Sequence, residues 1–592
     1  MVLAQPEVRT RAATGGTTAA PRYPNPPAGL TWRRRSLDLR GEPLPMRLHL
    51  MATDRNRTGS MSLSADQQIG LPGHSEEPHR RGVLAFSYDR WKPKLGPALG
   101  GLSVLVLSLV VYGMTLLPGV GWGDTAKLQY IAYIWGIPHR FGYPLFIFLS
   151  RLFLLLPVGS VAYRINLMSA VFAAGAVALT YLIILRLTRR DWVAAASGAL
   201  AFAFSRTFWA EANHAEVYSL NALIVAAVVL SLLAWHQTRR IGLLYLGVGL
   251  YALGYGNHMT MVTWLPAVLF VIVATDYRVL LDPKKVSVLA GLVLLGASQY
   301  LYIIIRAHQN PIHNEIRNEM GDWSWGGWWT WMTYSRFEGQ FFGYSLSEQV
   351  DLVRQFLDLS QRQFYRWGYI LGWIGAWEQL QASLTRTAFL GLIGACVAGF
   401  AMNYGRGRTT GQFYLIPAYL VFAVFVGCGL GAVRSKLAQL LTHQPRALAR
   451  PLWAGITVAS LALPAYPLVR NYAKVDRSHY QEPAEFARTF VENAEPEFIL
   501  IAGQQYNEVE AIFYVATVEA RKLTYHQFWQ GDAVEQWFGI RPIYCWEIQQ
   551  TAPRSPEERI PDEYILEPLP YLPGMARIIG KQTEDGILWV DR

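Results

Sequence analysis

The chain has 592 residues, of which 52% are hydrophobic and 16% charged, and it contains 21 tryptophans. A soluble protein of this size carries about 25% charged residues, so the composition excludes an ordinary soluble enzyme and predicts a membrane protein with aromatic residues at the lipid interface. The net charge of +11 comes with basic residues in short loops between apolar runs. Such residues set topology and do not indicate a nucleic-acid surface. Two of the three cysteines lie in apolar runs, which excludes a disulfide framework or a zinc motif.

The first segment, residues 1–95, differs from the rest of the chain. It is rich in Pro, Gly, Ser, Thr and Arg, and it contains neither an apolar run nor the hydrophobic core of a signal peptide. Such a composition cannot bury enough apolar surface to fold. We therefore predict a disordered basic tail on the cytoplasmic side of the membrane.

Residues 96–470 predict a transmembrane domain. A helix that crosses about 30 Å of hydrocarbon needs about 20 mostly apolar residues. The apolar runs predict about eleven transmembrane helices, at 97–120, 161–186, 191–208, 217–236, 241–257, 260–277, 286–305, 366–382, 387–404, 413–433 and 451–470. The segment 143–157 is apolar but contains Arg151 and ends at Pro157, so we expect a helix that lies at the interface without crossing it.

Basic residues predict the orientation of these helices. With the N-terminal tail inside, every inner loop carries at least one Lys or Arg, as the positive-inside rule requires. We expect a multi-pass protein of the cell (plasma) membrane with a cytoplasmic N-terminus. The outer segments are then the long loops 121–160 and 306–365, the short turns 209–218 and 256–260, and the region 471–592.

The region 471–592 predicts a small α/β domain outside the membrane. Residues 483–493 have a helical pattern, and FILIA at 498–502 and RPIYCW at 541–546 are typical of short strands. The fold class is therefore a polytopic α-helical membrane protein with an extracytoplasmic C-terminal α/β domain.

Asp124 is the most informative polar residue of the chain. It follows the first apolar run in the segment GWGDTAKLQ, and a carboxylate so close to a span is costly unless it faces water or does chemistry. Lys127 would share its face of a helix, so a local ion pair is one interpretation. Arg164, at the outer end of the second span, suits either snorkelling to the interface or a phosphate ligand.

Two short turns add further polar residues on the predicted outer face. In one of them, two carboxylates and a histidine lie within six residues, and a second histidine lies in the other turn. The pattern leaves three interpretations open: a divalent metal site, contacts to a sugar, or helix capping. The residues are Glu211, Asn213, His214 and Glu216 in the first turn and Asn257 and His258 in the second.

The outer loop 306–365 is dense in tryptophan. Tryptophan either anchors a segment at the lipid interface or stacks on a sugar. Anchoring is the default interpretation. The residues are Trp323, Trp325, Trp328, Trp329 and Trp331.

Taken together, these features resemble the GT-C superfamily of membrane glycosyltransferases, which use polyprenyl-phosphate-linked sugars. The chain is most similar to the bacterial branch of the protein O-mannosyltransferase-like transmembrane family. The resemblance covers roughly residues 98–592. It is carried by GWGDTAKLQYIAYIWGIPHRFGYPLF, VAYRINLMSAVFA, RTFWAEANHAEVYSLNAL, GYGNHMT, QFYLIPAYLVFA and EPEFILIAGQQYNEVEAIFYV.

The resemblance implies roles for the matching positions. It makes Asp124 the general base, and we expect Arg164 and Arg140 to bind the donor phosphate. This chain departs from the family at Lys127, where the family carries a glutamate, and at the residues Gly503 to Gln505, which replace an acidic stretch. We expect substrate contacts from Lys127, His139, Tyr143, Glu211, His214, Glu216, Tyr218, Asn257 and His258, with no metal and no cofactor.

The implied activity is inverting transfer of a sugar, by resemblance mannose, from a polyprenyl phosphate to an acceptor hydroxyl at the outer face. The expected partners are the lipid-linked donor, a protein or envelope-glycan acceptor and the bilayer, with no nucleic acid. Two alternatives stay open. One is a transporter or flippase for lipid-linked sugars, and the other is a non-catalytic glycan-binding relative.

Overall fold

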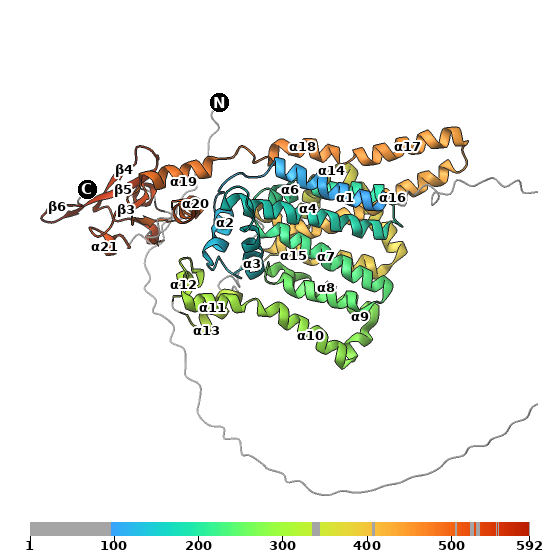
Figure 1. The fold of residues 1–592 in the computed structure, drawn as a ribbon, viewed down its shortest axis with the longest axis horizontal. Coiled ribbons are helices and arrows are strands. Elements are labelled where there is room, and N and C mark those ends of the chain that lie inside the picture. Colours follow the sequence, from blue (N-terminus) through green and yellow to red (C-terminus); the bar gives the residue numbers. More distant parts are fainter. Residues whose placement is uncertain are drawn as a thin grey trace, which may run out of the picture. The chain divides into compact units, whose positions relative to one another are not determined.

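The structure is a computed structural model, and the predicted tail 1–95 lies outside the residues that it describes (Figure 1). It describes residues 96–590 with the exception of 322, 334–343, 405–408, 504–505, 521–525, 529–532, 552 and 554–555. Part of the predicted loop 306–365 therefore also lies outside the described residues.

Long apolar helices form the larger part of the described chain and run side by side in one bundle (Figure 1). Eight helical segments among the described residues are long and apolar enough to cross a membrane. They are α1 (Gly96–Met114), α4 (Val161–Leu187), α7 (Val217–Thr238), η2 to η3 (Met259–Leu281) with α9 (Leu265–Asp276), α10 (Pro283–Ser298) with α11 (Leu301–Gln309), α15 (Leu384–Asn403), α16 (Ile416–Leu441) preceded by η5 (Thr409–Leu415), and α17 (Arg446–Ala462) with α18 (Ala465–Val475).

The other three predicted spans correspond to shorter or more polar helices. Two of them, α5 (Trp192–Ala203) and α8 (Ile241–Gly254), are apolar but short. The third, 366–382, is the second half of α14 (Leu346–Ala382), so the predicted outer loop 306–365 is in part helical. Tyr365, with φ 56° and ψ 177°, breaks α14 where the predicted span begins.

The segments that connect the long helices at the Asp124 end are also helical. The segment 143–157, predicted as a helix at the interface, contains α3, which is only ten residues long; its place at the interface stays a prediction. In α13, Trp325 and Trp329 are more than 60% exposed, as expected of interfacial anchors, whereas Trp331 is fully buried. These helices are α2 (Asp124–Ile134), α3 (Pro144–Phe153), α6 (Arg206–Ala212), α12 (Glu315–Met320) and α13 (Trp325–Thr333).

The C-terminal region folds around one mixed sheet, ordered β2-β1-β3-β5-β4, with β6 paired to β5. β1 lies parallel to β2 and β3, and the other pairs are antiparallel. The predicted strands at 498–502 and 541–546 are confirmed as β1 and β3, and the predicted helix is α19. The strands are β1 (Ile499–Ile501), β2 (His526–Phe528), β3 (Ile543–Trp546), β4 (Tyr564–Pro568), β5 (Met575–Thr583) and β6 (Gly586–Trp589). The helices are α19 (Glu482–Asn493), α20 (Tyr506–Tyr514), η6 (Val515–Glu519), α21 (Ala533–Trp537), α22 (Ile548–Thr551) and η7 (Pro556–Glu558).

The C-terminal domain packs on α2 through a shared apolar core. Tyr130 of α2 lies against Phe513 of α20 with ring centroids 4.5 Å apart. Ile131 of α2 belongs to the same buried cluster as Phe490 and Phe498 of the C-terminal domain. The helix that begins at Asp124 is therefore held between the transmembrane bundle and the sheet domain (Figure 1).

Glycines let the central helix α16 approach its neighbours closely. A Cβ atom at Gly429 would overlap the carbonyl oxygen of Leu371 in α14, and one at Gly375 would overlap that of Phe425 in α16. Helices in membranes associate largely through such close backbone packing. The α14–α16 contact therefore requires small residues at both positions.

We predict that Gly429→Ala lowers the thermal unfolding midpoint of the detergent-solubilised protein, because the added methyl group forces the two backbones apart, at a cost of about 1–3 kcal/mol. Tryptophan fluorescence measures this midpoint. Gly391→Ala in α15 is the matched control, since a Cβ there meets open space. An equal effect of the two substitutions would contradict the packing argument.

Candidate active site

The loop that leads into Asp124 is fixed by a buried pair of amides. The Gln129 side chain accepts a hydrogen bond from the Gly121 amide (3.1 Å) and donates one to Asn166 Oδ1 (2.8 Å). Asn166 Oδ1 also accepts from the Ala215 amide (2.9 Å). One network therefore ties the start of α2 to α4 and to the turn before α7, which sets the position of Asp124.

Asp124 is the first residue of α2, and its side chain is 51% exposed. Its Oδ1 lies 3.5 Å from His139 Nδ1. The His139 ring meets Tyr143 edge-on at 5.2 Å, and Tyr143 stacks on His258 at 5.9 Å with an interplanar angle of 7°. Four predicted site residues from three separate segments thus form one row.

Tyr218 at the start of α7 and Tyr414 in η5, just before α16, complete this cluster. Tyr218 lies 5.6 Å from the His258 ring, and Tyr414 lies 5.8 Å from both rings. Glu216, just before α7 begins, is close enough to Asp124 to be affected by its charge. We name Asp124, His139, Tyr143, Glu216, Tyr218, His258 and Tyr414 the Asp124 cluster.

The two carboxyl groups of this cluster, those of Asp124 and Glu216, differ in their exposure to solvent. The pKa of Glu216 lies well above its usual value, because the group is buried and because Asp124 and Glu211 are near. Burial, together with the nearby His139, lowers the pKa of His258 to about 3. The shift favours the protonated form of Glu216, and His258 is neutral at neutral pH, whereas Asp124 is the carboxyl group that is open to solvent.

The remaining turn residues make internal contacts. Glu211 Oε2 lies 3.9 Å from His214 Nε2; burial raises the pKa of Glu211 to about 8 and lowers that of His214 to about 3. Asn257 donates to the Val217 carbonyl (3.0 Å), and Asn213 donates to the Val475 carbonyl (2.8 Å). In the described part of the chain, no three His, Cys, Asp or Glu side chains are arranged to hold a metal ion.

Lys127 lies in a buried charge network and is only 1% exposed. Its Nζ is 3.1 Å from Glu510 Oε1 in α20 and 3.8 Å from Glu315 Oε2 at the start of α12. Tyr130 donates to the other Glu510 oxygen (2.6 Å), and His313 Nε2 lies 3.2 Å from Glu315. The ammonium group predicted to contact substrate thus joins α2 to the C-terminal domain.

The carboxylates in this network stabilise the charged form of Lys127. Burial lowers the pKa of Lys127, but Glu510, Glu315 and Asp124 outweigh burial and raise it overall. Sequence reasoning missed Glu315, Glu510 and His313, because no local pattern pairs Lys127 with residues so far along the chain. The one signal in the sequence was Lys127 itself, since the family carries a glutamate at this position, one turn after Asp124.

The two predicted phosphate ligands differ in their surroundings. Arg164 donates through Nε to the Val158 carbonyl (2.8 Å), through Nη1 to the Leu154 carbonyl (2.9 Å) and through Nη2 to the Gly159 carbonyl (3.2 Å). It thereby fixes the chain after α3. Arg140 is half-buried and follows His139 directly, in the same turn. Phosphate binding by either arginine stays a prediction.

An apolar groove of about 440 Å³ lies between α8, α9 and α10. At one end it reaches Tyr255 and Tyr300, which are joined by a hydrogen bond from the Tyr300 hydroxyl to the Tyr255 carbonyl (2.7 Å). Tyr300 is also close enough to Tyr143 to contribute to the raised pKa of the Tyr143 hydroxyl. The groove therefore leads from the lipid-facing helices toward the Asp124 cluster.

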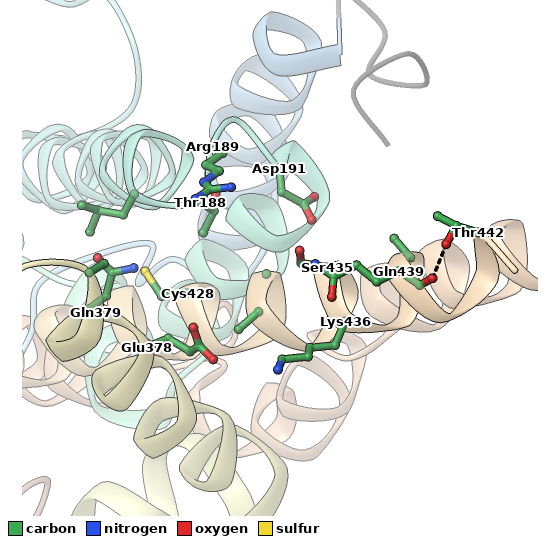
Figure 2. Close-up of a pocket in the computed structure, with 15 residues that line it drawn as sticks. Thr188, Arg189, Asp191, Glu378, Gln379, Cys428, Ser435, Lys436, Gln439 and Thr442 are labelled. Carbon is green, nitrogen blue, oxygen red and sulfur yellow. Dashed lines mark hydrogen bonds between the residues drawn. The ribbon is translucent and has the colours of Figure 1, made fainter. Parts of the chain in front are cut away.

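A polar cavity of about 510 Å³ lies at the opposite end of the bundle (Figure 2). Figure 2 shows Glu378 and Gln379 from α14 and Lys436 from α16 around it. Asp191 borders this cavity, caps α5 and pairs with Arg434 (2.9 Å). None of the predicted site residues lines it, so the cavity belongs to the packing between α4, α5, α14 and α16.

The described chain is a polytopic helical membrane protein with a GT-C-like fold and a C-terminal mixed sheet, as predicted. The crystal structure of ArnT from Cupriavidus metallidurans bound to undecaprenyl phosphate is similar, with a TM-score of 0.52, and the match covers 82% of this chain and 98% of that one. The two sequences are 12% identical, so this comparison establishes the fold alone.

Two sequence comparisons give a more specific relation. Residues 124–281 match the family model of the protein O-mannosyl-transferase TMEM260 N-terminal domain. The chain is 29% identical over 270 residues to protein O-mannosyl-transferase TMEM260 of Mus musculus, which is 44% of this chain and 35% of that protein. It is 29% identical over 235 residues to the tmem260 protein of Dictyostelium discoideum, which is 37% of this chain and 27% of that protein. The chain thus aligns with about a third of each relative's length.

We predict that Glu510→Ala destabilises the protein by about 3–5 kcal/mol, because it removes the closest partner of a buried lysine. The double variant Lys127→Met/Glu510→Leu is expected to recover most of this loss, since a buried ion pair can be replaced by apolar residues at little cost. Thermal unfolding and proteolysis of the C-terminal domain measure both effects. Glu492→Ala, an exposed residue of α19, is the control, and a double variant no better than Glu510→Ala would refute the pairing.

Glu315 gives the fold a dependence on acid pH. Burial raises the pKa of this carboxyl group, but Lys127 and His313 together bring it below its usual value of 4.5. A group with a depressed folded pKa stabilises the protein above its unfolded pKa, and this stabilisation is lost as the pH falls through the range below. We expect the difference in unfolding midpoint between wild type and Glu315→Gln to be largest near pH 7 and to shrink below pH 4.5. A difference that stays constant to pH 3.5 would argue against a charged Glu315.

Proposed function

We propose that this protein is a membrane glycosyltransferase of the O-mannosyltransferase kind, which transfers a sugar from a polyprenyl phosphate to an acceptor hydroxyl. The observation that carries the proposal is the Asp124 cluster. It places one solvent-open carboxylate beside buried polar and aromatic side chains at a single end of the bundle. The family match, which begins at Asp124 and includes Glu216 and His258, supports the same conclusion.

In the proposed reaction, Asp124 acts as the general base. An acceptor hydroxyl gives its proton to an Asp124 carboxylate oxygen while the hydroxyl oxygen attacks the anomeric carbon. The bond from that carbon to the phosphate oxygen breaks, the polyprenyl phosphate leaves with the electron pair, and the configuration inverts. General-base help of this kind accelerates a reaction by about 10²–10⁴-fold.

The buried members of the cluster bind and orient the sugar. A protonated Glu216 can donate a hydrogen bond, which an ionised carboxylate cannot. The neutral His258 ring lies between Tyr143 and Tyr218, and aromatic faces of this kind pack on the apolar face of a sugar ring. This arrangement leaves Asp124 as the base for the acceptor.

The apolar groove between α8, α9 and α10 is the proposed site for the donor's lipid chain. Its lining suits an isoprenoid, and it leads toward Tyr143. The similar ArnT structure contains undecaprenyl phosphate. Arg140 is the proposed phosphate ligand, because it directly follows His139 of the Asp124 cluster, whereas the three nitrogens of Arg164 donate to carbonyl groups that fix the chain after α3.

Several finer parts of the proposal rest on the family resemblance. These are mannose as the sugar, a secreted protein or an envelope glycan as the acceptor, and a place in the bacterial branch of the family. The plasma membrane as location and an extracytoplasmic Asp124 rest on the positive-inside pattern. A lipid-linked sugar transporter would need polar groups along a path through the bundle, whereas the Asp124 cluster lies at one end. The ion pair with Glu510 gives Lys127 a structural role, so the lysine is not by itself an argument for a degenerate relative.

We expect Asp124→Asn to lower sugar transfer by at least about 10²-fold, because the amide cannot accept the acceptor's proton. The measurement is incorporation of labelled sugar into protein and glycan fractions of membranes supplied with a panel of polyprenyl-phosphate sugars. Asp351→Asn, an exposed acid on α14, is the control. Equal rates for wild type and Asp124→Asn, at equal expression and unfolding midpoint, would overturn the role of Asp124.

A further inference from the structure

A second polar cavity, of about 420 Å³, lies at the same end of the bundle as the Asp124 cluster. Four basic side chains from three helices line it, and all four are exposed. We name them the basic pocket: Arg206 from α6, Arg362 and Arg366 from α14, and Lys474 from α18.

The walls of the basic pocket are tied together by polar side chains. Gln363 of α14 accepts from the Thr207 amide (3.0 Å) and donates to the Thr207 hydroxyl (2.7 Å). The Tyr365 hydroxyl donates to Asn471 Oδ1 (2.9 Å), and Asn471 donates to the Phe204 carbonyl (2.8 Å). These bonds join α14 to α6 and to α18. They therefore hold the basic side chains of the three helices around one cavity.

The break in α14 lies within this frame. Tyr365 has a positive φ of 56°, which is uncommon for a residue other than glycine. The surroundings stabilise it, since its ring meets Tyr466 edge-on at 4.8 Å in addition to the bond to Asn471. Backbone strain of this kind clusters at ligand sites, where the neighbouring structure holds it in place.

The charge of the pocket is unbalanced. Among the described residues that line it, Asp358 is the acidic one, and it pairs with Arg362 (2.8 Å). Arg206, Arg366 and Lys474 therefore leave a surplus of positive charge around one hollow. Scattered cations would suffice to anchor helix ends at the interface, whereas convergence from three helices suits an anion with several oxygen atoms.

The position of α18 indicates the source of this anion. α17 and α18 form the last apolar segment of the bundle, and Val469 of α18 is 74% exposed. An apolar side chain exposed on such a segment faces lipid, which places Lys474, five residues further on and next to the end of α18, at the depth of the headgroups. A soluble anion would need no lipid-facing wall.

We propose that the basic pocket binds the phosphate of an anionic phospholipid headgroup. The phosphate oxygens would accept from Arg206, Arg366 and Lys474, while the acyl chains would lie along α18. This proposal does not depend on the transferase activity, since the pocket contains no member of the Asp124 cluster.

The test measures the unfolding midpoint of the full-length protein in nanodiscs of phosphatidylcholine alone or with phosphatidylglycerol. We expect phosphatidylglycerol to raise the midpoint of wild type and to lose most of this effect in Arg206→Gln/Arg366→Gln/Lys474→Gln. Arg354→Gln, an exposed cation on α14 outside the pocket, is expected to respond as wild type does. An undiminished response of the triple variant would overturn the proposal.

Two further arms identify the source of the phosphate. Inorganic phosphate added to phosphatidylcholine nanodiscs is expected to leave the midpoint unchanged, and a shift as large as that from phosphatidylglycerol would overturn the lipid source. If the triple variant does not fold, the single variants Arg366→Gln and Lys474→Gln carry the test. Each is expected to retain less phosphatidylglycerol after purification than wild type, as measured by lipid extraction, and wild-type retention in both would refute the site.

Discussion

The buried ion pair between Lys127 and Glu510 is the constraint on which the candidate active site depends. Both side chains are 1% exposed, and a charge removed from water requires a close partner of opposite sign. Lys127 lies one turn after Asp124, and Glu510 belongs to the C-terminal domain, so docking of that domain fixes the helix that carries the proposed base. The sheet domain is therefore part of the site's framework, although it contributes no member of the Asp124 cluster.

Two kinds of contact hold this site in place. Glycines bring α14 and α16 together in the bundle and set the spacing of the helices. Amides and carboxylates at the ends of the helices then fix the connecting turns, as Gln129 and Asn166 do for the loop before α2. Because apolar packing gives little directional control in lipid, these polar contacts are what bring segments far apart in sequence to within hydrogen-bonding distance.

The sequence predicted the features that depend on local composition. Apolar runs located the long helices, and Asp124, Glu216 and His258 were expected from polar segments at the ends of predicted spans. His139, Tyr143 and Tyr218 were expected from the family resemblance, and Tyr414 was not expected. Features that depend on distant pairing were not predicted. Lys127 was expected to contact substrate, yet its main partner lies 383 positions away. Arg164 was expected at a phosphate, whereas the structure shows that its donors hold the chain after α3, a contact that only the folded turn reveals.

The central claim is that a lipid-linked sugar binds with its anomeric carbon beside Asp124. A cryo-electron microscopy structure of the protein with a non-transferable polyprenyl-phosphate sugar analogue tests it most directly. The account predicts the lipid chain between α8, α9 and α10, the phosphate near Arg140, and the anomeric carbon near enough to the Asp124 carboxylate for an acceptor oxygen to fit between them. A phosphate bound in the cavity beside Lys436, at the opposite end of the bundle, would contradict it.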